Sequence, residues 1–274
     1  MFNRYILLIL ALVCYLSGNA QLSTSKLFFD HLTTEEGLAH NYILSIFQDE
    51  DGFVWLGSDN GLNRYDGQHI DILSSNTKPA LGGNRIRRII QDKSKTLWIL
   101  HENGLDMMDH YTQHIRSFLY GRELKKHILG FGLDDNGDLA AFTESDILLY
   151  NSNSGSFDIK QTAPANFLFS AFVKCGNRYY LGTRRHGIIV YNENWKLLEH
   201  IYPISIQGGI LEDGLISLLR VDSNGSIWSV MAGLCIQKYD PVTRIVQTYP
   251  LSAHSVINRE VRDIIELNAD YMLV

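Results

Sequence analysis

The sequence has 274 residues, of which 45% are hydrophobic and 20% are charged, as in ordered globular proteins. Its formal net charge is −6 and its cations form no basic block, which argues against nucleic acid as a partner, because phosphate binding needs a concentrated cationic surface. The 14 Tyr, 12 Phe and 22 Gly, with only 5 Pro, favour strands joined by tight turns.

The first predicted element is a signal peptide over residues 1–20. Arg4 gives a positive start, Tyr5 to Leu16 form an apolar run, and small residues precede Gln21, where a signal peptidase would cut. We expect cleavage before Gln21 and export to the periplasm, with an uncleaved membrane anchor as the alternative. The mature domain would then span residues 21–274.

A motif of about 40 residues recurs along the rest of the chain. The spacing Asp-x-x-Gly-x-x-Trp occurs identically at 49–55 and 222–228, and a shift of 43 residues from Asp49 leads to a second copy at Asp92. A period of about 40 to 45 residues is typical of a propeller blade. The repeated structural positions are Asp49, Gly52, Trp55, Gly61, Asp92, Trp98, Gly104, Asp222, Gly225 and Trp228.

Each repeat divides into four strands. In the first, we expect strands at 43–48, 53–57, 62–65 and 69–73, separated by Asp-Gly and Asn-Gly turns that accept the positive φ of tight hairpins. A single four-stranded sheet cannot bury both faces, so the repeats must stack radially. We therefore predict an all-β fold, a β-propeller of four-stranded antiparallel blades, with about five full blades and a partial sixth in an incomplete ring.

The blades are expected at residues 41–83, 84–126, 127–166, 167–209, 210–256 and 257–274. Residues 26–32 precede them and are expected to form an isolated outer strand. Because Tyr271 to Val274 fall inside the second strand of the sixth blade, we expect the chain to be a fragment of a longer protein. Cys175 and Cys235 lie at opposite ends of neighbouring blades, too far apart to bridge, which predicts two free and mostly buried thiols.

Four segments of the first repeat resemble the two-component regulator propeller repeat. They are Phe29-x-His31-Leu32, Glu36-Gly37-Leu38-x-x-Asn41, Gln48-Asp49-x-Asp51-Gly52-Phe53-Val54-Trp55-Leu56-Gly57 and Asn60-Gly61-Leu62-Asn63-Arg64-Tyr65-Asp66-Gly67. The resemblance extends over residues 26–274 and is closest in the first repeat.

This family is typical of the periplasmic sensor region of hybrid two-component system histidine kinases of Bacteroides-like bacteria. The resemblance implies further C-terminal sensor, transmembrane and kinase domains in a longer parent protein, with a homodimer as one arrangement of that protein. It also implies an oligosaccharide or a similar small ligand. The histidine phosphoacceptor box and the ATP lid of a kinase are not in this sequence, so no enzymatic activity is expected of this chain.

Two groups of residues resemble metal sites. The Asp-rich turns at 49–52 and 134–138 lack the Glu and the helices of a calcium loop, and are better explained as hairpin turns. His110 and His114 have zinc-helix spacing, but they fall in a turn without further ligands. We therefore expect no metal and no cofactor. The tryptophans could stack sugars, but their shared place in each repeat favours packing between blades.

The candidate binding face follows from strand order. The entrance to the first strand and the loop between the second and third strands lie at the same end of each blade, and residues there differ between repeats, as in loop-borne recognition. Arg184 and Arg185 stand out in an acidic protein and predict an acidic oligosaccharide or similar anion, with a solvated loop as the alternative. The candidate ligand-binding residues are Tyr42, Asp59, Arg85, His101, Glu102, Arg184, Arg185, His186 and Arg259.

Three functions remain open at this point. An extracytoplasmic ligand sensor agrees best with the resemblance. A secreted polysaccharide lyase or hydrolase would need paired carboxylates from residues such as Glu102, Glu144, Glu212 and Asp213. A protein-binding scaffold would instead spread its contacts over one face, and the fold alone does not choose among the three.

Overall fold

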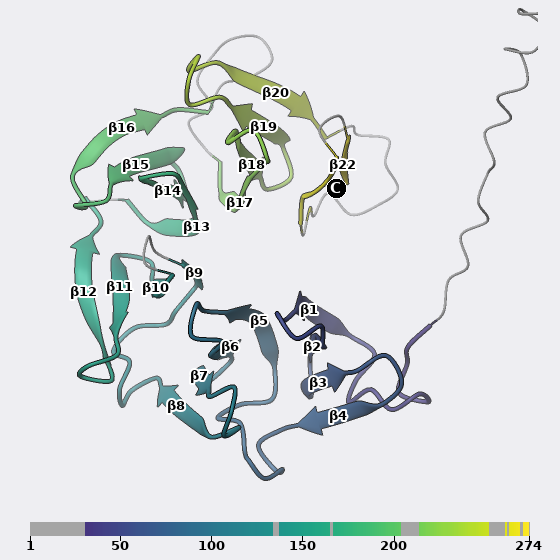
Figure 1. The fold of residues 1–274 in the computed structure, drawn as a ribbon. Coiled ribbons are helices and arrows are strands. Elements are labelled where there is room, and N and C mark those ends of the chain that lie inside the picture. The colour runs from purple at the N-terminus through teal and green to yellow at the C-terminus, as the bar shows by residue number, and fades with distance from the viewer. Residues whose placement is uncertain are drawn as a thin grey trace, which may run out of the picture. The chain divides into compact units, whose positions relative to one another are not determined.

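The computed structural model describes residues 31–133, 137–164, 167–203, 214–251, 261, 263–268 and 271–273. The chain divides into two compact units, Met1–Leu32 and Thr33–Val274. In the second unit the described residues form five four-stranded sheets, which lie as blades around a common centre (Figure 1). In every blade each strand pairs with the next along the chain, from the centre outwards.

Blade 1 consists of β1 (Ile43–Gln48), β2 (Val54–Ser58), β3 (Gly61–Tyr65) and β4 (Ile70–Leu73). Blade 2 consists of β5 (Ile86–Gln91), β6 (Leu97–His101), β7 (Gly104–Met108) and β8 (Ile115–Leu119). Blade 3 consists of β9 (Gly130–Leu133), β10 (Leu139–Phe142), β11 (Asp146–Asn151) and β12 (Ser156–Thr162).

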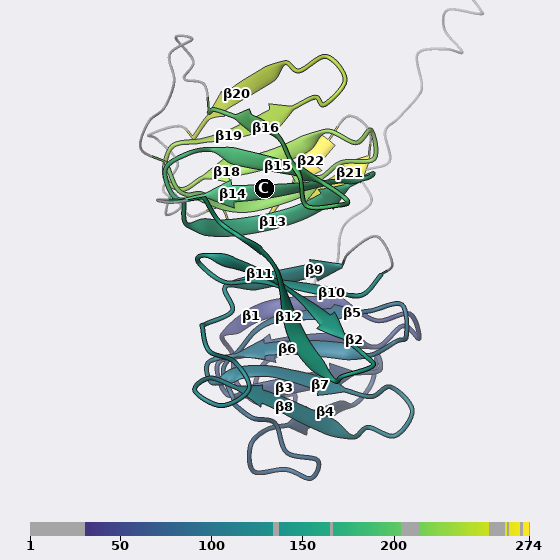
Figure 2. The ribbon, with the colours of Figure 1, turned by 90° about the vertical axis from the view of Figure 1, so that its left-hand side faces the viewer.

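Blade 4 consists of β13 (Phe169–Cys175), β14 (Arg178–Thr183), β15 (Ile188–Asn192) and β16 (Leu197–Ile201). Blade 5 consists of β17 (Ile216–Val221), β18 (Ile227–Met231), β19 (Cys235–Tyr239) and β20 (Val246–Pro250). A further two-stranded sheet pairs β21 (Ile265–Asn268) with β22 (Tyr271–Leu273). Figure 2, seen from the side of blades 3 and 4, shows their outer strands β12 and β16.

The predicted fold class is confirmed. All described sheets are antiparallel, and no described residue lies in a helix. In blade 1 the four strands begin and end within one residue of the predicted bounds, because the turns between them have strong local signals. The chain segments at 1–20 and 26–30 lie outside the described residues, as do residues 134–136 of the Asp-rich turn in blade 3.

The hydrophobic core lies between blades rather than within them. Between blades 1 and 2, Trp55 and Leu62 pack in one cluster with Ile86 and Ile99. These four side chains are at most 2% exposed. Because full burial of one such side chain contributes about 1.5–3 kcal/mol, the contact between neighbouring blades stabilises the ring strongly.

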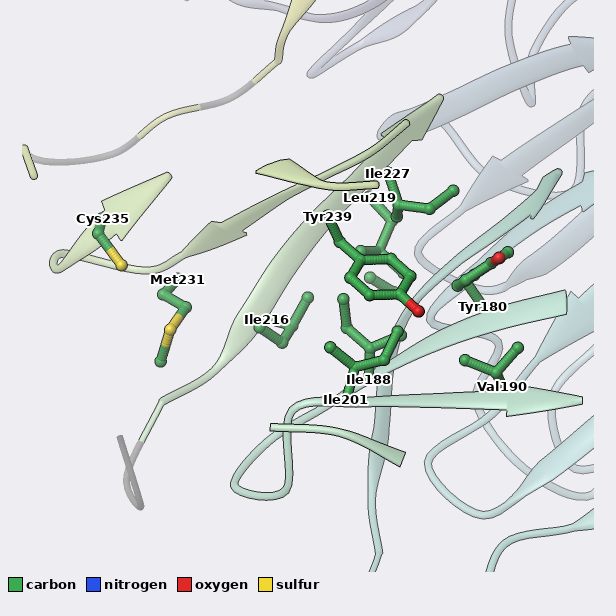
Figure 3. Packing of buried hydrophobic residues seen from close by; sticks show 11 residues of the cluster. Tyr180, Ile188, Val190, Ile201, Ile216, Leu219, Ile227, Met231, Cys235 and Tyr239 are labelled. Atoms are coloured by element: carbon green, nitrogen blue, oxygen red, sulfur yellow. The ribbon is translucent and has the colours of Figure 1, made fainter. Parts of the chain in front are cut away.

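The same arrangement recurs between blades 4 and 5, as Figure 3 shows. There, Tyr180 and Val190 of blade 4 share a cluster with Ile216, Ile227 and Tyr239 of blade 5. Two further clusters join blade 2 to blade 3 and blade 3 to blade 4. Blades 2, 3 and 4 therefore each contribute one face to each of two cores.

The repeated Asp and Trp positions form one hydrogen-bonded unit in blade 1. Asp49 Oδ1 accepts the backbone N–H of Asp51 at 3.0 Å and of Phe53 at 2.9 Å, which closes the turn between β1 and β2. Asp49 Oδ2 accepts the indole N–H of Trp55 at 2.7 Å. One carboxylate therefore holds both the turn and the aromatic side chain.

Blades 2 and 5 contain the same unit. Trp98 Nε1 donates to Asp92 Oδ2 at 2.9 Å, and Trp228 Nε1 donates to Asp222 Oδ2 at 2.9 Å. The indole N–H needs a partner when its ring is buried, and the Asp six residues earlier supplies it. This requirement explains why Asp and Trp recur at a fixed spacing.

Blade 4 is built differently at the same place. Its first two strands are joined by Gly176 and the residue after it, without an acidic side chain. Tyr180 takes the register position of the tryptophan, two residues before a strand glycine, and is 1% exposed. On the other face of the blade, Trp195 stacks on Tyr179 with ring centroids 4.2 Å apart and planes 5° from parallel.

Cys175 and Cys235 are free in the structure. Cys235 is buried in the core between blades 4 and 5, whereas Cys175 is half-buried and its Sγ donates to Gly225 O at 3.4 Å. Burial raises the pKa of both thiols, which keeps them in the protonated form at neutral pH.

Candidate functional site

The loops that carry the predicted binding residues meet at one end of each blade. In blade 1, Asp59 N donates to Tyr42 O at 3.1 Å, which ties the loop between β2 and β3 to the entrance of β1. In blade 4, Arg184 N donates to Leu168 O at 3.0 Å and makes the equivalent link. We call this end of the blades the loop face. Two separate groups of the predicted residues lie on it.

The first group, the Arg85 group, consists of Tyr42, Asp59, Arg85 and Glu102. Arg85 Nε binds Asp59 Oδ1 at 2.7 Å and so joins blade 2 to blade 1, with both side chains more than a third exposed. The Tyr42 side chain is 46% exposed nearby, at the entrance to β1. These charged and aromatic groups remain available to a ligand.

Glu102 binds the backbone of the segment that carries Arg85. Its Oε1 accepts the backbone N–H of Asn84 at 3.0 Å, and its Oε2 accepts that of Arg85 at 2.8 Å. Burial alone would raise the pKa of Glu102, but these two backbone donors hold it below its usual value. The ionised carboxylate therefore fixes the backbone that carries Arg85.

His101 does not lie on the loop face. The structure places it at the end of β6 with no exposed surface, where its Nε2 is 3.3 Å from Asp106 Oδ1. The sequence indicates that the residue precedes a loop, but it does not indicate which way the side chain points. His101 is therefore placed to act through its neighbours rather than to touch a ligand.

The second group, the Arg184 group, lies on blades 3 and 4. Arg184 Nη2 binds Glu144 Oε1 at 2.8 Å, with both side chains 51% exposed. Arg185 follows it and is also exposed. The members of the group are Glu144, Phe167, Arg184, Arg185, His186, His200 and Tyr202.

Aromatic rings lie beside this ion pair. The ring of His186 is 4.2 Å from that of Phe167, and the ring of His200 is 3.9 Å from that of Tyr202. His200 Nε2 contacts the carbonyl oxygen of His186, which joins the two ring pairs. Tyr202 is 47% exposed, so the aromatic cluster reaches the surface next to Arg184.

Three of these aromatic residues were not among the predicted site residues. Phe167 lies in the entrance to β13, and His200 and Tyr202 lie at the end of β16 and just beyond it. Their signal in the sequence is weak, because aromatic residues are common throughout the chain and most of them are in the core. Arg259, the ninth predicted residue, lies outside the described residues.

Two inner strands carry arginines that the sequence analysis also did not single out. The guanidinium of Arg88 in β5 lies 5.6 Å from the ring centre of Phe131, and Arg220 in β17 binds Asp263 at 2.9 Å. Burial and the charge of Arg220 lower the pKa of Arg88 to about 10, while Asp263 opposes this shift. Arg88 therefore stays charged at neutral pH.

The candidate acid–base residues are engaged in other contacts. Both oxygens of Glu102 accept backbone N–H groups, and Glu144 binds Arg184, while residues 212 and 213 lie outside the described residues. Among the side chains that the structure describes, no three His, Cys, Asp or Glu residues converge in a way that could hold a metal ion. No helix capable of spanning a membrane occurs in the described part of the chain.

Comparison with known proteins agrees with this architecture. The structure is similar to the extracellular domain of a putative hybrid two component system from B. thetaiotaomicron, with a TM-score of 0.65 and 20% identity over 81% of this chain and 32% of that chain. It is also similar to virginiamycin B lyase from Staphylococcus aureus, with a TM-score of 0.60 and 13% identity over 78% of this chain and 71% of that chain.

A third similar structure is PorZ, a surface component of the type-IX secretion system of Porphyromonas gingivalis, with a TM-score of 0.59 and 15% identity over 80% of this chain and 35% of that chain. The chain therefore spans about a third of the two component system domain and of PorZ. No curated protein sequence matches it. At these identities the structural similarity establishes the fold.

The sequence itself matches one protein family. Residues 37–60, which run from the entrance of β1 to the loop before β3, match the model of the two component regulator propeller. This is the segment in which Asp49 caps the turn and binds Trp55. The resemblance noted in the sequence is thereby confirmed: the chain is a β-propeller that is similar to the two component regulator propeller family over residues 37–60.

Proposed function

We propose that this chain is the ligand-sensing propeller of a two-component signalling protein and acts outside the cytoplasm. The family match at residues 37–60 and the shared fold with an extracellular domain of such a system support this proposal. The chain covers about a third of that domain. In this proposal, the kinase that would receive the signal would lie in a longer parent protein. An N-terminal signal peptide would deliver the propeller to the periplasm.

The proposed ligand class is inferred from the residues of the Arg184 group. It combines exposed guanidinium groups with aromatic rings at the surface of the loop face. Guanidinium groups bind carboxylate and sulfate oxygens with paired hydrogen bonds, and the faces of sugar rings pack on aromatic side chains. We therefore propose an acidic oligosaccharide as the ligand.

The Arg184–Glu144 ion pair makes this site responsive. It joins blade 4 to blade 3, and because both side chains are half exposed it contributes little to stability. A ligand anion can replace Glu144 at small cost and so change the link between two blades. Signalling then follows if the ligand has different affinities for the linked and unlinked arrangements.

The test is a calorimetric titration of the purified chain with a panel of acidic and neutral glycans. We expect saturable binding of acidic glycans, and at least a tenfold loss of affinity when Arg184→Ala and Arg185→Ala are combined, since each charged hydrogen bond contributes about 1.5–3 kcal/mol. Arg244→Ala is the matched control, because Arg244 lies in the exposed turn between β19 and β20 at the opposite end of a blade. Unchanged affinity for every bound glycan in the double variant would reject the proposed site.

A polysaccharide lyase or hydrolase is the second candidate, because the fold is also that of virginiamycin B lyase. The same glycan panel separates the two functions. Prolonged incubation with the chain leaves every glycan intact if the chain is a sensor. The appearance of new reducing ends or unsaturated products would favour the enzyme.

A further inference from the structure

Two ionisable side chains are completely buried beneath the Arg85 group. His101 and Asp106 have no exposed surface, and His101 Nε2 lies 3.3 Å from Asp106 Oδ1. Neither of these two atoms has a hydrogen-bond partner among the described residues. Buried polar atoms without hydrogen-bond partners are rare and destabilise the fold, so the presence of this pair needs an explanation.

The other atoms of the pair hold the backbone of the loop face. Asp106 Oδ2 accepts the N–H of Gly82 at 2.8 Å, and His101 Nδ1 accepts the N–H of Asn103 at 3.2 Å. Since Nδ1 accepts a hydrogen bond, it carries no proton, and the proton of the neutral ring is on Nε2. The hydrogen bond from Asn103 can form only while Nδ1 of His101 carries no proton.

Other blades make the same contact with a group that does not titrate. In blade 1, Ser58 stands at the position of His101, and its hydroxyl accepts the N–H of Asn60, two residues later, at 3.3 Å. In blade 3, Thr143 accepts the N–H of Ser145 in the same way at 3.3 Å. Among these three blades, an imidazole replaces the hydroxyl only in blade 2.

Blade 1 also shows the neutral counterpart of Asp106. Asn63 stands at the equivalent position, and its Oδ1 accepts the N–H of Ala39 at 2.7 Å, as Asp106 accepts that of Gly82. Ser58 and Asn63 thus accept the equivalent backbone N–H groups in blade 1, and neither of them carries a charge. The ionisable pair in blade 2 is not required for the blade fold as such.

The turn controlled by His101 carries Glu102, whose carboxylate holds the backbone N–H groups of Asn84 and Arg85. The connection before β5 is also pressed against the pair, because a Cβ on Gly83 would lie only 2.4 Å from His101 Nδ1. Any displacement of the turn is therefore passed to Arg85 and to its contact with Asp59.

We propose that His101 and Asp106 are positioning residues, and that the protonation of His101 sets the conformation of the Glu102–Asn103 turn, and with it the placement of Arg85 and the affinity of the loop face for its ligand. With neutral His101, the turn is held and Arg85 is fixed. When His101 gains a second proton, Nδ1–H faces the N–H of Asn103, the turn moves away, and Arg85 is released. The last step, ligand affinity, rests on the proposed sensor function.

Charged groups around the pair are few. Asp106 and Glu102 are the acidic side chains beside His101. Arg85 lies beyond Glu102, where its charge is matched by Asp59. The strand residues paired with His101 are Ile86 and Gly104, and those paired with Asp106 are Ile99 and Ser117. None of these four residues has a side chain that ionises.

The first experiment needs no ligand. In the isotope-labelled chain, the amide resonances of Glu102, Asn103, Asn84 and Arg85 are followed by NMR between pH 8 and pH 5, the range in which imidazole ordinarily changes charge. We expect them to move together with one midpoint. We expect no such movement after His101→Ser and Asp106→Asn are combined, which installs the blade 1 pair. Resonances that stay fixed, or that move equally in the variant, would overturn the proposal.

Asp106→Asn alone serves as a second variant, because it preserves the shape of the side chain and the acceptor for Gly82. It removes the charge that favours protonated His101, so the midpoint moves to lower pH. An unchanged midpoint would also overturn the proposal. This variant keeps the test valid even if the smaller serine leaves too large a void for the double variant to fold.

The second experiment measures affinity for an acidic glycan at pH 7.5 and pH 5.5. We expect a loss of about fivefold or more at the lower pH in the natural chain and none in the double variant. Equal losses in both proteins would contradict the link to the ligand. If no glycan binds at any pH, the proposed function fails, while the amide titration still decides whether His101 controls the turn.

Discussion

Blades 1 and 4 reach the same four-stranded geometry by different means. In blade 1 a single carboxylate, Asp49, closes the first turn and holds Trp55. In blade 4 a two-residue turn contains no carboxylate, and stacking of Trp195 on Tyr179 covers one face of the blade. The comparison shows that a blade needs a closed turn and a filled face, and that polar or aromatic contacts can supply them.

The stabilising contacts of the two blades differ in how far apart the contacting residues are in the sequence. The Asp49–Trp55 contact joins residues six positions apart, whereas Tyr179 lies in β14 and Trp195 lies in the later turn between β15 and β16. A polar unit of this kind has few alternatives, because the buried indole N–H and two backbone donors all need the same carboxylate. We therefore expect blades 1, 2 and 5 to lose more than blade 4 when their key residues are changed.

The largest effect is expected for Trp98→Ala. Trp98 is 1% exposed between blades 2 and 3, and truncation of such a side chain costs about 3–5 kcal/mol. Trp195→Ala in blade 4 removes a half-buried ring and should cost only about 0.5–1.5 kcal/mol. Urea unfolding followed by far-UV circular dichroism measures both. Similar losses in the two variants would contradict the proposed difference between the blades.

A smaller effect is expected for Asp49→Ala. The substitution leaves the indole N–H of Trp55 and two turn N–H groups without their acceptor, at a cost of about 1–3 kcal/mol. The matched change in blade 4 is Asn192→Ala, because Asn192 Oδ1 also caps a turn but holds no ring. The unfolding free energy of that variant should fall by about 1 kcal/mol or less. The comparison fails if Asn192→Ala is the more damaging change.

The smallest effect is a difference in acid sensitivity between blades 5 and 4. Burial alone would raise the pKa of Asp222, but donors from Trp228, Lys238 and Ser226 hold it below the ordinary value of 3.8. Because the folded-state pKa is depressed, the carboxylate stabilises the protein above pH 3.8, and this contribution is lost as the pH falls through the folded-state value. The turn between β13 and β14 has no such carboxylate.

Hydrogen exchange at pH 5 and pH 3, corrected for intrinsic rates, measures this difference. Protection of the amide of Ser226 should fall more than that of Arg178 in blade 4. In Asp222→Asn the fall at Ser226 should disappear. An equal fall at both turns in the natural chain would show that acid acts on the propeller as a whole.

These local and distant contacts also explain how much could be predicted from the sequence. The strands of blade 1 were predicted within one residue, because the Asp-Gly and Asn-Gly turn motifs mark the end of each strand in the sequence. The stacking of Trp195 on Tyr179 was not predicted, because no local pattern links a turn residue to a ring on another strand.

The candidate site was predicted less completely. Strand order was enough to bring Asp59 and Arg85 to the same end of neighbouring blades, where they form an ion pair. It was not enough to show that His101 points inward, since that depends on how the connection before β5 packs over it. The comparison of His101 with Ser58 at the equivalent repeat position was the available signal.

The placement of the cores between blades sets the unit of cooperative folding. A blade removed from the ring would expose half of the core on each of its sides, so a single repeat is not an independently stable module. Duplication or loss of a repeat is tolerated only when the two newly joined faces fit each other. Breaks in the chain are best tolerated at exposed turns between third and fourth strands, such as residues 240–245, where Val242 is 91% exposed and neither neighbouring core is divided.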